Sequence, residues 1–414
     1  MRSESGVYSA CVGARQAGAG SRDGQHVMPT ASDLPRSAAG VPDARTGARP
    51  LPTRRELVAT LKRYAKPDTP RALMHFALDW SIYVGGFALL LFAPSFIVKL
   101  TGSLAIAAAM GRLFSFAHNA AHENLATSRR LNRVLAFFAF TPIFYNYRLW
   151  CHEHHALHHP YCNDTKPDAY RPFSKAEFDA LPKWRQWLER LYRGPYVIGW
   201  SVYYLKERHV QTKIWVPAYV PRELRRAAWL NSAWVVAYAS ALVALLVHAP
   251  AFANNLTVTS ALLLGLVIPF MLFDGADGFT LYVQHTDPRI PWFRDDEIDR
   301  DGPGRTELIS VHLDVPRWFG WYAHDTYAHP VHHLLPRIPF FNAYAAQQEL
   351  DRLLGPAAVV RKPSLAWLRT TTRCCQLYDW EKKQWLGFDG KPTYPAYEWP
   401  PSLSERQDPR GARA

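Results

Sequence analysis

The chain has 414 residues, with 48 Lys and Arg against 35 Asp and Glu, and a formal net charge of +13. Its hydrophobic share of 48% is too high for a wholly disordered protein. Its mean hydropathy of −0.19 excludes a bundle that lies entirely in lipid. The five cysteines form no disulfide framework and no CxxC metal motif, which favours a reducing compartment over a small secreted scaffold. The composition therefore predicts a few membrane spans that carry a large polar part, and the 15 Trp fit the aromatic belts of membrane interfaces.

The amino-terminal 50 residues are rich in Gly, Ala, Ser, Arg and Pro and show no apolar period, so we predict a disordered leader over residues 1–50. The leader contains no continuous apolar run and is therefore not a secretory signal peptide; an organelle transit peptide is an alternative that three aspartates disfavour. Residues 53–66 place Leu57, Leu61 and Tyr64 at helical spacing among basic residues. We expect an amphipathic helix on a membrane surface there, with an ordinary surface helix as the alternative.

Four apolar stretches are each close to the length that crosses a bilayer core. They cover residues 74–93, 95–117, 227–247 and 256–273. The links within each pair are short, so we predict two helical hairpins. Residues 131–145 are also apolar but short, and we expect them to be interfacial or buried in protein. A soluble protein with buried core helices is the alternative interpretation.

Basic residues lie before the first predicted hairpin and in the long loop between the hairpins. Residues 183–226 carry ten Lys and Arg, whereas the hairpin tips carry Lys99 alone. The positive-inside rule then places both termini and the long loop in the cytoplasm, with the spans in a bacterial inner membrane or an ER-type membrane. We therefore predict an all-α integral membrane protein: four transmembrane helices in two hairpins, with a helical cytoplasmic cap. Residues 51–360 would form this membrane domain and residues 361–414 a cytoplasmic C-terminal tail.

Ten of the 17 histidines lie in three short segments. His118 and His122 form an HxxxH motif at the end of the second predicted span. Residues 152–159 read HEHHALHH, and residues 329–333 read HPVHH. On a helix, spacings of three and four residues place the imidazoles on one face. The predicted topology also places all three segments on the same side of the membrane.

A set of this size indicates metal binding. Imidazole is a suitable ligand for Zn, Cu, Fe and Ni, and eight or more histidines exceed what one tetrahedral zinc ion uses. We therefore expect two metal ions in a His-rich di-metal site carried by the cap. Metal-bound histidines usually have a hydrogen-bond acceptor behind them. The acidic residues near the three segments are Glu123, Glu153, Asp164, Asp168 and Asp325.

At these residues the chain resembles the membrane-bound fatty acid desaturase family, in particular its acyl-lipid omega-6 and omega-3 members. That family carries three histidine boxes in this order, HxxxH, then HxxHH or HxxxHH, then HxxHH, around a di-iron centre. Residues 282–292 (YVQHTDPRIPW) and 324–336 (HDTYAHPVHHLLP) resemble further segments of the family. The resemblance covers roughly residues 50–350.

The resemblance implies a set of metal ligands and no catalytic side chain beyond them. The implied ligands are His118, His122, His155, His158, His159, His324, His329, His332 and His333. His154 is an alternative to His155, because its distance from the following histidine pair gives the HxxxHH spacing. His152 is a surplus histidine of the same box and a further alternate. His285 is an alternative to His324 as the extra histidine ahead of the third box.

The resemblance also implies an activity, namely O₂-dependent removal of two hydrogens from neighbouring carbons of a fatty acyl chain to give a cis double bond. The cofactor would be two Fe ions, O₂ the co-substrate, and the substrate an acyl lipid, acyl-CoA or acyl-ACP. The sequence has no cytochrome b5-like HPGG segment, no dinucleotide-binding GxGxxG in a βαβ unit and no iron–sulfur cysteine set. A separate electron donor, such as ferredoxin or cytochrome b5, is therefore implied, and no nucleic acid partner.

Two other functions also fit the sequence. A hydroxylase, an acetylenase or a carotenoid-type oxygenase would use the same site. A His-rich membrane metal-binding or transport protein is the non-enzymatic alternative, although transporters place their ionisable residues in mid-span.

Overall fold

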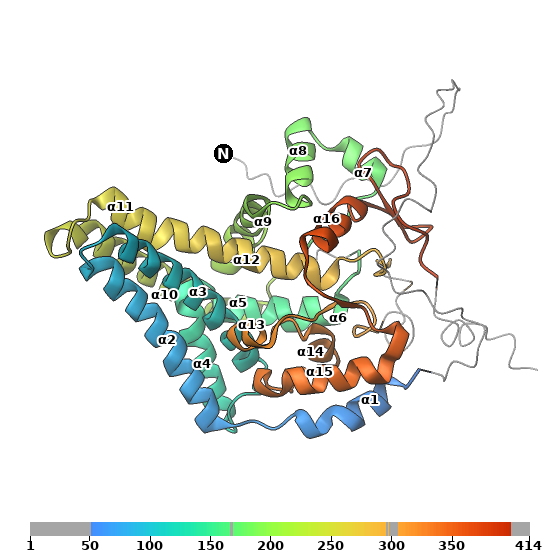
Figure 1. Cartoon of the computed structure of the whole chain (residues 1–414), viewed down its shortest axis with the longest axis horizontal. Helices are drawn as coiled ribbons and strands as arrows, with labels where there is room; N and C mark the ends of the chain where they lie inside the picture. Colours follow the sequence, from blue (N-terminus) through green and yellow to red (C-terminus); the bar gives the residue numbers. More distant parts are fainter. Residues whose placement is uncertain (1–50, 166–168, 295–296, 298–304, 399–414) are drawn as a thin grey trace, which may run out of the picture. The chain divides into compact units, whose positions relative to one another are not determined.

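The computed structural model describes residues 51–165, 169–294, 297 and 305–398. The predicted leader, residues 1–50, lies outside these ranges, and so does Asp168. The described residues are mostly helical, with two sheets of two short strands each (Figure 1). The prediction of a helical protein is therefore confirmed.

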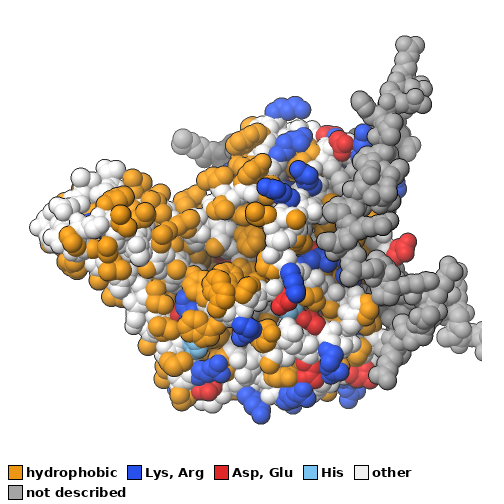
Figure 2. Space-filling model, in the orientation of Figure 1, with side chains coloured by type: hydrophobic (Ala, Val, Ile, Leu, Met, Phe, Trp, Pro, Cys, Tyr) orange, Lys and Arg blue, Asp and Glu red, His pale blue; other side chains and the backbone are white. Residues whose placement is uncertain are grey.

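Four helical stretches among the described residues are long and apolar enough to cross a membrane. They are α2 (Thr69–Phe92), α3 (Phe96–Ala121), α10 (Arg222–His248) with the 3₁₀ turn η5 (Ala249–Ala251), and a fourth stretch of α11 (Val258–Leu262), the π-helix η6 (Leu263–Val267) and α12 (Ile268–His285). Figure 2 shows hydrophobic side chains covering the part of the surface formed by the ends of these helices, and Ile97 and Leu230 are 74% and 65% exposed. Apolar surface of this extent fits contact with lipid, and the chain is a membrane protein.

Helices α2 and α3 are joined by three residues and pack closely against each other. A Cβ atom on Gly102 would lie 2.6 Å from the carbonyl oxygen of Gly86 and 2.9 Å from the backbone nitrogen of Leu90. No side chain fits at that distance, so glycine allows the two backbones to approach each other. Asp68 caps the start of α2, and Pro94 follows its end.

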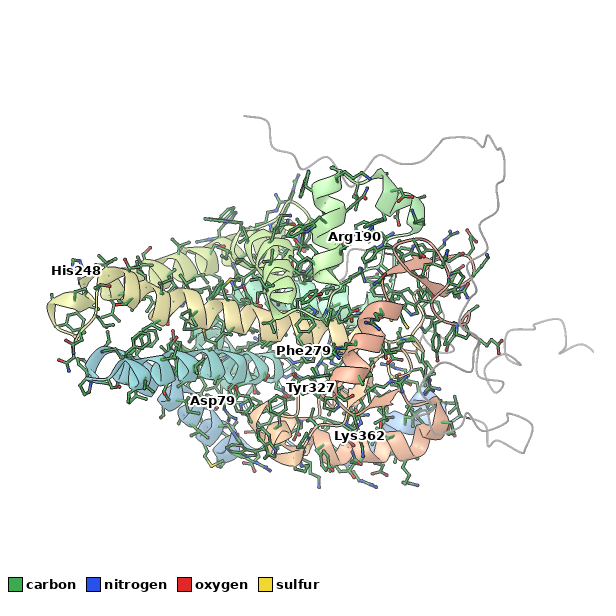
Figure 3. The ribbon with its side chains drawn as sticks, turned by 45° about the horizontal axis from the view of Figure 1, so that its top comes forward. Asp79, Arg190, His248, Phe279, Tyr327 and Lys362 are labelled. Atoms are coloured by element: carbon green, nitrogen blue, oxygen red, sulfur yellow. The ribbon has the colours of Figure 1, made fainter. Side chains whose placement is uncertain are left out.

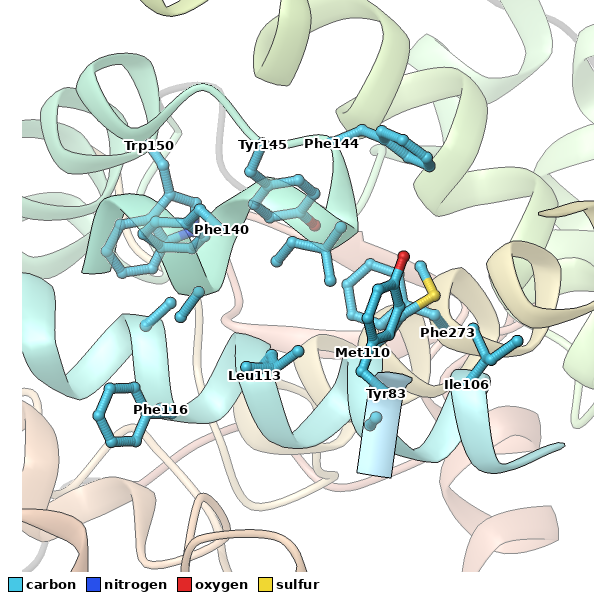
Figure 4. Close-up of a cluster of buried hydrophobic side chains, with 14 of the residues drawn as sticks. Tyr83, Ile106, Met110, Leu113, Phe116, Phe140, Phe144, Tyr145, Trp150 and Phe273 are labelled. Carbon is cyan, nitrogen blue, oxygen red and sulfur yellow. The ribbon is translucent and has the colours of Figure 1, made fainter. Parts of the chain in front are cut away.

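The main hydrophobic core lies where α3 packs against α4 (Arg129–Phe140) and α12. Figure 4 shows Leu113 and Phe116 on α3, with Phe140, Tyr145 and Trp150 across from them. All five side chains are buried. Residues 131–145, predicted to be interfacial or buried, therefore contribute one wall of this core.

The fourth long helix extends further than its hydropathy predicts. The sequence predicts a span that ends at Phe273, but α12 continues to His285. The extension includes two buried aspartates and packs against α9 (Val197–Tyr203). A Cβ on Gly278 would lie 2.6 Å from the carbonyl oxygen of Trp200, so the two helices are in backbone contact. Protein rather than lipid covers this polar stretch, which is why the helix persists where the apolar run stops.

The remaining elements surround the carboxyl ends of α3 and α12. The helices are α1 (Arg54–Leu61), η1 (Lys62–Tyr64), η2 (Thr141–Ile143), α5 (Tyr147–His152), η3 (Glu153–His158), α6 (His159–Tyr161), α7 (Lys175–Ala180), α8 (Lys183–Tyr192), η4 (Tyr204–Ile214), α13 (Arg317–Tyr322), α14 (His329–Leu334), α15 (Phe340–Leu354), η7 (Gly355–Ala357) and α16 (Leu365–Cys374).

The predicted amphipathic helix is present as α1 and η1. Its apolar residues Leu57 and Leu61 are buried against α15, so it is an ordinary surface helix rather than one docked on lipid through that face.

The described residues after 360 fold against the segment that follows α12. Strand β1 (His312–Leu313) pairs in parallel with β2 (Val360–Arg361), and β3 (Leu377–Asp379) pairs antiparallel with β4 (Gln384–Leu386). The Trp385 indole donates to the carbonyl oxygen of Asp287 at 3.2 Å, and the Trp292 backbone N–H donates to the Tyr378 hydroxyl at 3.0 Å. The carboxyl-terminal hairpin therefore supports the loop directly behind the end of α12.

Replacing Gly102 by Ala is expected to destabilise the protein, because the new methyl group would overlap the Gly86 carbonyl. Overpacking of this kind costs about 1–3 kcal/mol. Gly111→Ala, on the same helix, is the matched control, since nothing outside its own helix lies within 4 Å of the added Cβ. The apparent melting temperature of the detergent-solubilised protein measures the difference. Equal melting temperatures for the two variants would contradict the close packing of α2 and α3.

Candidate metal centre

Nine histidine side chains converge in two groups. The first group consists of His118, His122, His154, His159 and His332, and the second of His158, His285, His329 and His333. Within each group, one ring nitrogen from every histidine lies within 4.8 Å of the others. The side chains come from the end of α3, the segment from η3 to α6, the end of α12, and α14. Segments more than 200 residues apart in the chain thus supply a single cluster.

In the first group the Nε2 atoms face a common point. The Nε2 atom of His154 lies 2.8 Å from that of His118, 3.0 Å from that of His122 and 2.9 Å from that of His159. The Nε2 atom of His332 lies 3.1 Å from that of His159. A ring nitrogen has either one hydrogen or one lone pair, so it cannot hydrogen-bond to three other ring nitrogens at once. A shared cation would satisfy all of them, and the donor set therefore fits a metal ion.

In the second group the Nε2 atoms also face one another. The Nε2 atom of His329 lies 2.8 Å from that of His285 and 2.9 Å from that of His333. The His158 ring lies 4.9 Å from the His285 ring and 5.0 Å from the His333 ring, between centroids. Behind His285, its Nδ1 faces the Oδ1 of Asn163 at 3.1 Å. No sequence pattern singled out Asn163, which orients the ring as outer partners of metal-bound histidines do.

Two pairs of consecutive histidines are divided between the groups. His158 belongs to the second group and His159 to the first, while His332 belongs to the first and His333 to the second. The rings of His159 and His333 lie 4.6 Å apart between centroids. The two groups are therefore direct neighbours.

Six histidines of the two groups lie outside the long helices in surroundings that favour the neutral ring. Burial, followed by the neighbouring imidazoles, lowers the pKa of each ring well below the ordinary histidine value. This holds for His122, His154, His159, His329, His332 and His333. Neutral imidazole is the form that binds a metal.

The second histidine segment is not the regular α-helix that its spacing suggests. Glu153–His158 forms a π-helix, η3, whose hydrogen bonds span five residues. His154 and His159 are five residues apart and face the same point, whereas in an α-helix His154 would pair with His158. The π-helix instead directs His158 toward the second group.

The structure leaves the implied ligands His155 and His324 and the alternate His152 outside the groups, and it places the alternates His154 and His285 inside them. His155 is exposed, with its ring centroid 4.5 Å from that of His122. His152 stacks on a tyrosine ring at 6.4 Å. His324 is buried, and its Nε2 lies 2.7 Å from a carboxylate oxygen of Asp79. His285, the alternative to His324, belongs to the second group.

Glu153 connects η3 to the second π-helix, η4. The Lys213 ammonium of η4 donates to Oε2 of Glu153, and the Tyr219 hydroxyl donates to Oε1 at 2.5 Å. Burial raises the pKa of Glu153, but the Lys213 charge and the hydrogen bonds outweigh burial and leave that pKa below the ordinary value. Burial lowers the pKa of Lys213. This buried ion pair holds the π-helix that carries two of the nine histidines, His154 and His158.

Three of the acidic side chains that the sequence suggested as acceptors behind the histidines contact groups other than histidine. Glu123 pairs with Arg133 at 2.7 Å, and Asp325 pairs with Arg317 at 2.7 Å. Asp164 accepts a hydrogen bond from the Thr165 hydroxyl at 3.2 Å.

Aromatic rings enclose the first group on its core side. Trp150 stacks on His154 with centroids 4.3 Å apart, and Phe114 stacks on His118 at 6.3 Å. Phe114 also contacts Tyr145 edge-on, and Figure 4 shows Trp150 and Tyr145 on the same side of α3. The aromatic wall provides an apolar surface beside the group.

Four membrane-length helices with clustered imidazoles at their ends define a membrane protein with two adjoining candidate metal sites. Comparison with known sequences agrees: residues 94–363 match the family model described as fatty acid desaturase. This chain therefore belongs to the fatty acid desaturase family and is a membrane oxidoreductase, a desaturase.

Three relatives illustrate the similarity. The omega-6 fatty acid desaturase, chloroplastic, of Glycine max is 27% identical over 319 residues, which are 76% of this chain and 70% of the relative. The sn-1 oleoyl-lipid 12-desaturase of a Picosynechococcus species is 27% identical over 336 residues, which are 79% and 90% of the two chains. The sn-1 acyl-lipid omega-3 desaturase (ferredoxin) of a Synechocystis species is 24% identical over 321 residues, which are 74% and 84%.

Replacing His154 by Gln is expected to remove the metal of the first group, whereas His155→Gln is expected to retain it. A chain that binds about two ions would then bind about one, because the central ligand of one group is lost. Elemental analysis of the purified proteins measures the metal-to-protein ratio. Loss of metal from the His155 variant, with retention in the His154 variant, would reverse the assignment.

Replacing Lys213 by Met leaves Glu153 buried without its cation. Breaking a buried ion pair in this way destabilises a protein by about 3–5 kcal/mol. The double variant Glu153→Leu with Lys213→Met removes both charges and is expected to recover part of that loss, since neither charge is then left unpaired. Thermal unfolding of the three proteins tests this. Equal stability of the single variant and the unmodified protein would show that the pair does not hold η3.

Proposed function

We propose that this desaturase introduces a cis double bond into the acyl chain of a lipid, with O₂ as co-substrate and two iron ions held by the two histidine groups. The observation that carries the proposal is the convergence of nine imidazoles into two adjoining groups. Imidazole is a suitable ligand for iron. The relatives named above act, by their printed names, on omega-6, oleoyl-lipid and acyl-lipid substrates.

The geometry of the two groups supports one ligand set. One iron would be held by His118, His122, His154, His159 and His332, and the other by His158, His285, His329 and His333. In this assignment His154 replaces His155, and His285 replaces His324. When bound, the two irons with O₂ supply the oxidant for an unactivated C–H bond, which no side chain can supply.

The protein's own side chains would then bind and orient the acyl chain. Phe114, Tyr145 and Trp150 form an apolar wall beside the first group. A wall of this kind would hold two neighbouring methylene groups close to the irons and keep water away. Placement of the reacting carbons decides between hydrogen removal and oxygen insertion.

We further propose that the four long helices form two transmembrane hairpins, with both termini and the histidine groups on the cytoplasmic side. The basic residues before α2 and between α9 and α10 support this orientation. His118 and His285 lie at the ends of α3 and α12, which fits a site at the membrane surface capped by the segments between and after the hairpins.

Two electrons per double bond would come from a separate protein. The name of one relative includes ferredoxin, and cytochrome b5 is the other candidate class. Lys and Arg side chains near the proposed cytoplasmic face, such as Arg129 and Arg130, are exposed and suit an acidic carrier.

Expression of the full chain in a host with simple membrane lipids tests the proposal. The expected result is a new unsaturated acyl species that forms in air and not under argon, detected by mass spectrometry. The His332→Ala, His333→Ala double variant is expected to insert into the membrane and give no product, because each residue serves a different iron.

The other outcomes are also informative. A hydroxylated, acetylenic or oxidised carotenoid product would show that the same site performs a different oxidation. Purified protein with zinc and without O₂ uptake would favour a membrane metal-binding or transport protein and contradict the proposal. About two irons per chain together with a new double bond would support it.

A further inference from the structure

A buried ionic cluster joins the first two long helices to the loop ahead of the third histidine segment. Arg112 on α3 donates to Asp79 on α2 at 2.5 Å, and the Nε2 of His324 lies 2.7 Å from the other carboxylate oxygen of Asp79. Arg112 also donates to the backbone carbonyl of Tyr322 at 2.6 Å. All three ionisable side chains are no more than 1% exposed. Ionisable side chains buried within membrane-spanning helices are rare and mark functional sites.

A small cavity lies between this cluster and the first histidine group. Its volume is about 20 Å³, and its lining includes His324 on one side and His118 and His332 on the other. Asn119 and Thr326 also line it and offer further polar atoms. A cavity of more than about 10–15 Å³ with several polar neighbours can hold one water molecule.

The second ring nitrogen of His324 has no protein partner. Among the described residues, nothing hydrogen-bonds to His324 Nδ1, although the ring is 1% exposed. Its other nitrogen is held by Asp79, and Phe116 and Phe340 pack against the ring. A buried ring nitrogen without a partner costs free energy, and His324 is one of the residues that line the cavity.

We propose that one water molecule in this cavity connects His324 to the first histidine group, and that the Asp79–His324 pair supplies protons through this water while O₂ is reduced. The inference rests on the O₂-dependent activity proposed above. His324 then is a proton-donating residue rather than a metal ligand. Asp79 and Arg112 are positioning residues, because they act through His324.

The stoichiometry of the proposed reaction requires a source of protons. Formation of one double bond transfers two hydrogens from neighbouring acyl carbons to O₂, together with two electrons from the external carrier and two protons, and yields two water molecules. Before each of the two proton transfers, His324 takes up a proton from bulk solvent on Nδ1. In the transfer that Nδ1–H bond breaks, the cavity water accepts the proton, and the water releases one of its own protons to the oxygen being reduced. Nε2–H remains bonded to Asp79, as in other His–Asp pairs in which the carboxylate orients the ring and stabilises its charge.

The surroundings of His324 determine the expected pH dependence. Burial lowers its pKa, the hydrogen bond and charge of Asp79 raise it, Arg112 lowers it and Asp325 raises it, and the result is a pKa below the ordinary histidine value. The other titratable groups near it are His75 on α2 and, in the lining of the cavity, His118 and His332. The protonated form is therefore populated on the acid side, so turnover through this path increases as the pH falls and decreases as the pH rises.

The test uses full-length, iron-loaded protein in which His324→Gln and Asp79→Asn are compared with the unmodified chain. His248→Gln is the matched control, because His248 is exposed at the far end of the long helices from Asp79, as Figure 3 shows. The iron content, the turnover between about pH 6 and about pH 8, and the turnover ratio in H₂O and D₂O are measured for each protein. Loss of a positioned proton donor is expected to reduce turnover about 100-fold.

The expected result is that His324→Gln and Asp79→Asn retain iron, turn over slowly, and lose the rise in turnover toward low pH that the unmodified protein and His248→Gln show. Loss of iron from His324→Gln would identify His324 as a ligand and overturn the inference. Equal loss of turnover at every pH, with an unchanged D₂O ratio, would indicate a structural role and also overturn it. If His324→Gln fails to fold, Asp79→Asn decides by the same criteria.

Failure of the proposed function itself gives a different result. In that case the unmodified protein and His248→Gln form no unsaturated product even with iron, O₂ and an electron source. If those two proteins are active while both test variants keep the normal rate and pH dependence, only the proton path is refuted.

Discussion

The structure depends on a single electrostatic requirement: imidazole ring nitrogens face one another at hydrogen-bond distance. Without a cation, most of these lone pairs would lack a partner, at a cost of about 1–3 kcal/mol each when buried. The long helices, the π-helices η3 and η4 and the carboxyl-terminal hairpin together hold the rings in these positions. Most of the chain's unusual features, such as the buried Glu153–Lys213 pair and the polar extension of α12, occur beside the histidines.

The larger features of the fold could be predicted because they follow from local rules. Apolar runs of about 20 residues and short links predicted the long helices, and three histidine-rich segments indicated the candidate metal centre. Most of the histidines that the structure brings together were identified in this way. The continuation of the fourth long helix past Phe273 could not be predicted, because hydropathy alone cannot detect that α9 covers the polar turns that follow.

The choice among neighbouring histidines could not be predicted, because it depends on helix type. A π-helix adds one residue to a turn, and this addition brings His154 and His159 together and leaves His155 outside. His285 reaches the site only because α12 continues beyond its apolar run. Asn163 contacts His285 across more than a hundred residues of chain, and no local pattern signals that contact. His324, by contrast, belongs to neither histidine group. Its Nε2 atom contacts the Asp79 carboxylate instead, and no local sequence pattern signals that contact.

The division of consecutive histidines between the two groups limits how the site can move. His158 with His159, and His332 with His333, each connect the two groups through a single peptide unit, and neighbouring Cα atoms are about 3.8 Å apart by covalent geometry. If each group binds an ion as proposed, rotation of one long helix against another would not separate the two ions without breaking ligand bonds. The backbone would then limit how far the two ions can move apart.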